Sequence, residues 1–254
     1  MALFIIGAVL TLAGSAGWAY GSYLKEAEQN WLLWTILGIA CVVIGLALTI
    51  TGLILHRKKN ENVRSGKEVN IKRLVLTAIL LGLGSALSLV KFWQMPLGGS
   101  VTLLSMLPIA LISIEYGVGW GLISSFAYSL IQLALDLPAV LSWGLTPAAL
   151  VGTFLLDYIL AFTVLGLSGL FRRKKIWGIC GGVFLALFLR FIFHVISGTI
   201  IFDVWMPDGW TNPLWYSICY NGTFMLPELV MTMAGTIILF KLPHFNKLIE
   251  SNLE

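Results

Sequence analysis

The segment FLRFIFHVISG, residues 188–198, places an arginine and a histidine in the middle of a long apolar run. Arg190 and His194 are four residues apart, so on a helix they share one face. The surrounding run, residues 177–201, is long enough to cross a bilayer as a helix. An ionisable group that faces lipid costs on the order of 2–3 kcal/mol or more. Both side chains are therefore expected to face the interior of a helical bundle.

The whole chain has the composition of an integral membrane protein. Of its 254 residues, 58% are hydrophobic and only 11% are charged, whereas soluble domains carry about 25% charged residues. The mean hydropathy is +0.92. The apolar runs are continuous and do not alternate with polar residues, which predicts helices and not a β-barrel. The predicted fold class is an all-α integral membrane protein.

Eight membrane-spanning helices are predicted from the apolar runs. They cover residues 2–19, 32–55, 74–91, 101–115, 118–135, 146–170, 177–201 and 215–240. A polar, charged segment interrupts the series after the second span and has no apolar periodicity. The predicted organisation is an N-terminal transmembrane hairpin of unassigned role (1–55), a basic cytoplasmic linker (56–73) and a six-span block (74–254).

Lysine and arginine determine the predicted orientation, because cytoplasmic loops of membrane proteins are enriched in both. With both termini in the cytoplasm, 13 of the 16 lysines and arginines fall on the inner side. This bias accounts for the net charge of +4, so a nucleic-acid partner is not needed to explain it. The expected location is the cell membrane.

The sequence lacks the motifs of several other protein classes. Cys41, Cys180 and Cys219 all lie in apolar runs, which predicts neither a disulfide framework nor a zinc site. Neither a metal nor another cofactor is expected. There is no GxxxxGK(S/T) sequence, so ATP hydrolysis would need another subunit, and no HExxH or GxSxG sequence indicates an enzyme.

Four ionisable residues lie within predicted spans of the six-span block: Asp157, Arg190, His194 and Glu228. One interpretation is a structural ion pair, such as Asp157 with Arg190, that joins two helices. The other is a polar ligand site, since the four groups come from three helices and lie in or near their predicted outer halves.

Aromatic residues gather in the predicted outer loops, residues 91–100, 136–144 and 202–216. An interfacial aromatic belt is sufficient to explain Trp143 and Trp215. The 202–216 loop holds three tryptophans among two aspartates, two prolines and a glycine, which predicts a structured lid. Flat rings beside carboxylates suit a planar cationic or heteroaromatic ligand.

Small residues recur at four-residue spacing along the predicted span 74–91, at Ala78, Gly82 and Ala86. Such a stripe allows a second helix to approach closely. Packing within the bundle and docking of a separate membrane protein explain the pattern equally well.

Three segments of the chain resemble the ThiT family, the thiamine-specific substrate-binding (S) components of energy-coupling factor (ECF) vitamin transporters. They are MPLGGSVTLLSMLPIAL (95–111), LLDYILAFTVLGLSGLFRRK (155–174) and the stretch from FLRFIFHVISGTIIF to WYSICYNGTFMLPE (188–228). The resemblance covers residues 74–245 and implies a six-helix S-component bundle. The first two spans lie outside the family core.

The resemblance also implies residue roles. It implies a thiamine pocket on the outer side, closed by the loop that follows the first core span. The implied substrate-binding residues are Asp157, Tyr158, Arg190, His194, Phe202, Trp205, Trp210, Tyr216 and Asn221. Asp157 stands where family members often have glutamate, and Arg190 where lysine can occur. Arg190 is expected to pair with a carboxylate instead of touching a cationic ring. Ala78, Gly82 and Ala86 resemble the face that docks onto the transmembrane coupling protein.

The predicted function is that of a substrate-binding membrane subunit of an ECF-type vitamin importer. Its predicted partners are thiamine, a transmembrane coupling protein, two ATPase subunits and the lipid bilayer. An S component for another vitamin or a thiamine precursor is one alternative. A proton-coupled secondary transporter, with Asp157 and His194 as a relay, is a second. An intramembrane enzyme that uses the same two residues as acid and base is a third.

Overall fold

The computed structural model describes residues 71–174 and 176–242. The chain divides into two units, residues 1–69 and 70–254, and the description that follows concerns the second. The predicted spans 2–19 and 32–55, the hairpin that they form, and most of the predicted linker lie outside the described residues.

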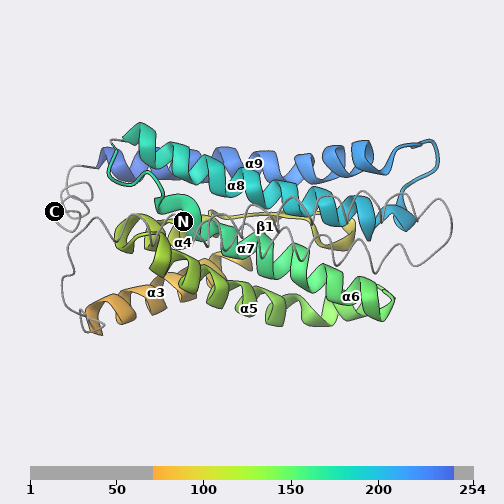
Figure 1. Ribbon diagram of the computed structural model, residues 1–254, viewed down its shortest axis with the longest axis horizontal. Coiled ribbons are helices and arrows are strands. Elements are labelled where there is room, and N and C mark those ends of the chain that lie inside the picture. The colour runs from red at the N-terminus through yellow and green to blue at the C-terminus, as the bar shows by residue number, and fades with distance from the viewer. Residues whose placement is uncertain (1–70, 175, 243–254) are drawn as a thin grey trace, which may run out of the picture. The chain divides into compact units, whose positions relative to one another are not determined.

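Figure 1 shows the described helices, with α8 and α9 running side by side. The elements are α3 (Ile71–Ser88), β1 (Lys91–Gln94), η1 (Pro96–Gly98), β2 (Ser100–Thr102), α4 (Met106–Tyr116), α5 (Val118–Ser142), α6 (Pro147–Thr153), η2 (Phe154–Leu160), α7 (Ala161–Thr163), η3 (Val164–Gly169), α8 (Ile176–Ile200), η4 (Asp203–Trp205) and α9 (Pro213–Lys241).

The six helical segments predicted between residues 74 and 240 are all present. Four of them are long and apolar enough to cross a membrane: Val118–Ser142, Pro147–Gly169, Ile176–Ile200 and Pro213–Lys241. The helices α3 and α4 are apolar but shorter. The described part departs from an all-α fold at one place, where β1 and β2 pair as a short antiparallel hairpin.

The prediction of an outer loop at residues 136–144 is wrong, because most of this segment is helical. The helix α5 continues through Pro138 and ends at Ser142. Proline removes one backbone donor and normally ends or kinks a helix, but membrane helices tolerate it where neighbouring groups satisfy the freed carbonyl. Asp136 therefore lies on the helix α5 and not in a loop.

Glycines bring the helical segment η3 into backbone contact with α4 and α5. A Cβ atom on Gly166 would lie 2.4 Å from the Leu122 nitrogen, and one on Gly169 would lie 2.1 Å from the Ser113 carbonyl oxygen. The Ser113 hydroxyl donates to the Gly166 carbonyl and accepts from the Gly169 N–H at 2.9 Å. These close contacts fix the position of the polypeptide that follows the site residues of η2.

We expect Gly166→Ala to destabilise the bundle, because the added methyl group would collide with backbone atoms that cannot rotate away. Such overpacking costs about 1–3 kcal/mol or more. The matched control is Gly119→Ala, since nothing lies within 4 Å of a Cβ at that position of α5. Thermal unfolding of the two purified variants in detergent should give a clearly lower midpoint for Gly166→Ala. Equal midpoints would contradict this account of the packing.

Candidate functional site

A cavity of about 270 Å³ lies between the β1–β2 hairpin and the helical segments α5, η2, α8 and α9. Seven of the nine residues predicted as substrate-binding line it: Asp157, Tyr158, Arg190, His194, Phe202, Tyr216 and Asn221. The other two, Trp205 and Trp210, are not among the lining residues. Trp205 packs on Phe202 with ring centroids 5.7 Å apart, and Trp210 packs on Tyr216 at 5.3 Å, so each stands behind a lining ring.

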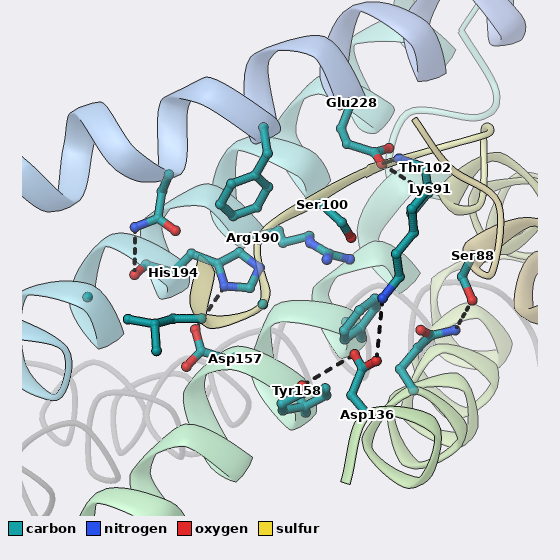
Figure 2. Close-up of a pocket in the computed structure, with 18 of the residues that line it drawn as sticks. Ser88, Lys91, Ser100, Thr102, Asp136, Asp157, Tyr158, Arg190, His194 and Glu228 are labelled. Carbon is teal, nitrogen blue, oxygen red and sulfur yellow. Dashed lines mark hydrogen bonds and ion pairs between the residues drawn. The ribbon is translucent and has the colours of Figure 1, made fainter. Parts of the chain in front are cut away.

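Asp157 is held on both of its oxygens by residues of α8. His194 Nδ1 lies 2.9 Å from Oδ1, a contact that Figure 2 shows. The Ser197 hydroxyl donates to Oδ2. The predicted structural pair of Asp157 with Arg190 is therefore wrong, because histidine and serine are the partners of this carboxylate. The contact fixes the carboxylate at the cavity wall, where it presents negative charge to the interior.

The segment η2 is a π-helical turn that carries both Asp157 and Tyr158 to the cavity. Such turns are rare and often mark functional sites in helices. The Tyr158 hydroxyl donates to Asp136 Oδ2 at 3.3 Å, and Lys91 Nζ lies 3.8 Å from Asp136 Oδ1. Figure 2 shows this chain of contacts, which links the start of the hairpin to α5 and to η2.

Arg190 does not have the partner that was predicted for it. Among the described residues it forms no ion pair with a carboxylate, so the expectation that it pairs with one is wrong. Its guanidinium carbon instead lies 3.8 Å from the centroid of the Phe162 ring, in a cation–π contact. Its Nε and Nη1 atoms are buried and have no hydrogen-bond partner among the described residues.

Asn221 is positioned by a close approach of α8 and α9. A Cβ on Gly198 would lie 2.3 Å from the Ser217 hydroxyl oxygen, so a larger residue there would force the Ser217 side chain to move. Asn221 Nδ2 donates to the backbone oxygens of His194 at 3.2 Å and Ser217 at 2.9 Å. Because these bonds occupy the amide nitrogen, Oδ1 is the atom of Asn221 that can accept from a ligand.

The loop that follows α3 forms part of the cavity wall. Gly98 and Gly99 of this loop line the cavity. Gly98 has φ +101°, and a Cβ there would lie 2.8 Å from the Trp143 ring, while one on Gly99 would lie 2.7 Å from Phe224. The hairpin backbone thus rests directly on aromatic rings. From the predicted lid at 202–216, only Phe202 and Tyr216 reach the cavity.

Aromatic rings form much of the wall at the predicted outer end of the cavity. Trp143 and Phe202 meet edge to face with centroids 5.8 Å apart, and Tyr216 and Tyr220 lie 5.9 Å apart. Trp143, which an interfacial belt was sufficient to explain from the sequence, also lines the cavity.

Several lining residues were not predicted from the sequence. They are Ser88, Lys91, Gln132, Asp136, Tyr220 and Phe224, together with Glu228, which was noted as an ionisable group but not as a binding residue. A signal for three of them exists in the sequence, because Tyr216, Tyr220, Phe224 and Glu228 recur every four residues and so share one face of α9.

The formal charges around the cavity favour a monovalent cation. Three carboxylates line it, from Asp136, Asp157 and Glu228, against two basic side chains, Lys91 and Arg190. One negative charge is in excess when His194 is neutral. In a medium of low dielectric constant this excess attracts a cation more strongly than it would in water. Among the described residues no cluster of histidine, cysteine, aspartate and glutamate is arranged to hold a metal ion.

The stripe Ala78, Gly82 and Ala86 is exposed on α3. No atom lies within 4 Å of a Cβ placed on Gly82. Within the described part of the chain, these residues therefore do not pack against another helix of the bundle.

Comparison with known proteins identifies the family of the chain. The family model described as "Thiamine transporter protein (Thia_YuaJ)" matches residues 74–247. The chain is 35% identical over 194 residues to "Thiamine transporter ThiT" of Bacillus subtilis (strain 168), which covers 71% of this chain and 93% of that protein. A solved structure of ThiT from Listeria monocytogenes is 21% identical, with a TM-score of 0.56, and covers 70% of this chain and 98% of that one, which supports the fold. The chain therefore belongs to the thiamine transporter protein family (Thia_YuaJ), the ThiT family of S components, and is a multi-pass membrane protein of a transporter family and not an enzyme.

Proposed function

We propose that this chain is the substrate-binding subunit of an ECF-type importer, which binds thiamine in the described cavity from the outer side of the membrane. A transmembrane coupling protein and two ATPase subunits would then drive delivery of the vitamin. The observation that carries the proposal is the cavity itself, where the fixed carboxylate of Asp157 lies among aromatic rings with one negative charge in excess.

The chemistry of thiamine matches these groups. Its thiazolium ring has a permanent positive charge, and its aminopyrimidine ring is flat and both donates and accepts hydrogen bonds. Asp157 opposes the charge in a site of low dielectric constant. The rings of Trp143, Phe202 and Tyr216 can stack on a flat ligand and add cation–π attraction. Asn221 Oδ1 supplies an acceptor for the ligand's amino group.

Tryptophan fluorescence tests the ligand assignment. Purified full-length protein should show quenching of tryptophan emission on addition of thiamine at sub-micromolar concentration, because Trp143 lines the cavity. Trp143→Phe should remove much of the quenching. The matched control is Trp177→Phe, since Trp177 is 84% exposed and does not line the cavity. Quenching by a different vitamin but not by thiamine would contradict the proposal.

A proton-coupled secondary transporter remains a second candidate, favoured by the direct contact between His194 Nδ1 and Asp157 Oδ1. The two functions differ in their energy source. An importer that depends on ATPase partners loses uptake when those partners are deleted, whereas a proton-coupled carrier keeps uptake and loses it when the proton gradient is collapsed.

A further inference from the structure

Two arginine side chains lie at one tight turn at the predicted inner end of the bundle. The turn, residues 116–117, joins α4 to α5, and Gly117 has φ +89°. Arg73, in the first turn of α3, contacts the ring of Tyr116. Arg172, between η3 and α8, lies against Gly117, where an added Cβ would be 3.3 Å from its guanidinium carbon. Two guanidinium groups from distant parts of the sequence therefore lie at adjacent residues.

The guanidinium of Arg73 is held in place by aromatic rings. Its central carbon lies 4.0 Å from the centroid of the Trp120 ring and 5.1 Å from that of Tyr116. The Trp120 ring is fixed in turn, because its Nε1 donates to the Thr77 hydroxyl at 2.9 Å. Contact with a ring face leaves the N–H groups at the edges of a guanidinium unused. The Nε atom of Arg73 is buried and has no hydrogen-bond partner within the part of the chain that the structure describes.

Arg172 is positioned by the end of α4. Its Nη1 donates to the backbone oxygens of Glu115 at 2.7 Å and Ile114 at 3.4 Å, in the last turn of that helix. A cation is favourable there, because the C-terminal end of a helix carries partial negative charge. Among the described residues these bonds use one of the three guanidinium nitrogens, which leaves Nε and Nη2 for another acceptor.

Positive charge is in excess around this turn. Burial lowers the pKa of the Arg172 guanidinium, and the positive charge of Arg173 lowers it further. The Glu115 carboxylate raises this pKa, and the charge of Arg73 lowers it again, so the two arginines at the turn repel each other. Glu115 is the one carboxylate among the described groups that act on Arg172. An added anion would relieve the repulsion between the arginines.

Exposed aromatic and basic residues beside Arg172 indicate the depth of this turn in the membrane. Trp177, at the start of α8, is 84% exposed, and tryptophan is enriched where lipid headgroups meet water. Lys174 is exposed too, and its Nζ lies 5.5 Å from the centroid of the Phe171 ring. Lysine commonly lays its apolar stem on apolar groups and keeps its charge at the interface. The anion that a bilayer supplies at this depth is the phosphate of a lipid headgroup.

We propose that Arg73 and Arg172 together bind the phosphodiester headgroup of an anionic phospholipid in the predicted inner leaflet. The unused N–H groups of both side chains donate to phosphate oxygens, whose spacing matches the planar fork of arginine. Basic residues at the cytoplasmic ends of membrane helices favour anionic lipids in general. Here the aromatic rings and the carbonyls of α4 hold two of them in place for one phosphate. The inference is independent of the ligand in the cavity, because neither arginine lines it.

Lipid competition on the full-length protein tests the site. Purified protein, stripped of lipid in a neutral detergent, receives equal amounts of phosphatidylglycerol and phosphatidylcholine, which share the phosphodiester but differ in net charge. Native mass spectrometry measures the ratio of the two lipids that stay bound. We expect a preference of roughly 10- to 30-fold for phosphatidylglycerol, from about fivefold for each arginine.

Two outcomes with the unmodified protein would overturn the proposal. Equal retention of the two lipids would do so, and would favour an acidic segment of a partner protein as the occupant of the turn. Loss of the preference on addition of inorganic phosphate, at the same concentration as the lipids, would show that the arginines bind a soluble anion instead.

Variants then assign the preference to the two arginines. Arg73→Gln and Arg172→Gln should each lower the ratio about fivefold. The matched control is Lys241→Gln, which removes the same charge from an exposed residue in the last turn of α9, on the same predicted side. Its ratio should stay within about twofold of the unmodified protein.

Thermal unfolding in lipid-free detergent shows whether each variant is folded. Arg172 also caps α4, so Arg73→Gln, which removes no helix cap, is the deciding variant if Arg172→Gln unfolds. An Arg73→Gln protein that is folded and has the same lipid ratio as Lys241→Gln would overturn the proposal.

Discussion

Asp157→Asn is expected to weaken thiamine binding by roughly 30-fold or more, since removing one partner of a desolvated charge pair costs about 2–5 kcal/mol. The substitution removes the negative charge that opposes the thiazolium ring. It also places an amide nitrogen where an oxygen now accepts from Ser197 or contacts His194. Titration of the purified variant with thiamine, followed by calorimetry or tryptophan fluorescence, measures the loss directly.

The matched control for this change is Asp208→Asn. Asp208 lies in the exposed 206–212 loop outside the cavity, so its variant loses the same formal charge without altering the site. Cys219→Ala, at a free cysteine that does not line the cavity, provides a second control. If Asp157→Asn and Asp208→Asn bind thiamine with the same affinity as the unmodified protein, Asp157 does not belong to the binding site.

The helices of the described part could be predicted because their apolar length is a local property. The hairpin at residues 91–102 could not, since its strands span only four and three residues and carry no alternating pattern that a strand would need. The continuation of α5 through Pro138 has no local signal, because a proline in sequence marks a helix end far more often than it lies inside one. Only the surrounding bundle decides between these two outcomes.

The candidate site was predictable where its residues are related by helical spacing or by the family resemblance. Arg190 and His194 share a face of α8, and both line the cavity. The contact of Lys91 with Asp136 joins residues 45 positions apart across the cavity, and no local pattern connects them. The error on Arg190 has a similar cause. From the sequence one can infer that a buried cation needs a partner, but not whether the partner is a carboxylate or the face of an aromatic ring. In the structure the partner of Arg190 is the ring of Phe162.

The second large effect is expected on the exposed face of α3. We expect the triple variant Ala78→Leu, Gly82→Leu and Ala86→Leu to abolish thiamine uptake by cells that contain the ATPase and coupling subunits. Small residues let two membrane helices approach closely, and three leucine side chains would hold a partner helix away. Overpacking of about 1–3 kcal/mol at each contact corresponds to docking roughly 5- to 150-fold weaker for each substitution.

The binding function should survive the same substitutions, because none of the three positions lines the cavity. Their side chains point away from the bundle, where added leucines meet lipid at little cost in stability. The control is Ala134→Leu combined with Ala234→Leu, which enlarges two exposed alanines on α5 and α9. Uptake by the control should be normal, and purified triple variant should bind thiamine with unchanged affinity. Normal uptake by the triple variant would show that α3 does not dock the partner, whereas loss of thiamine binding would show that the substitutions act on the bundle itself.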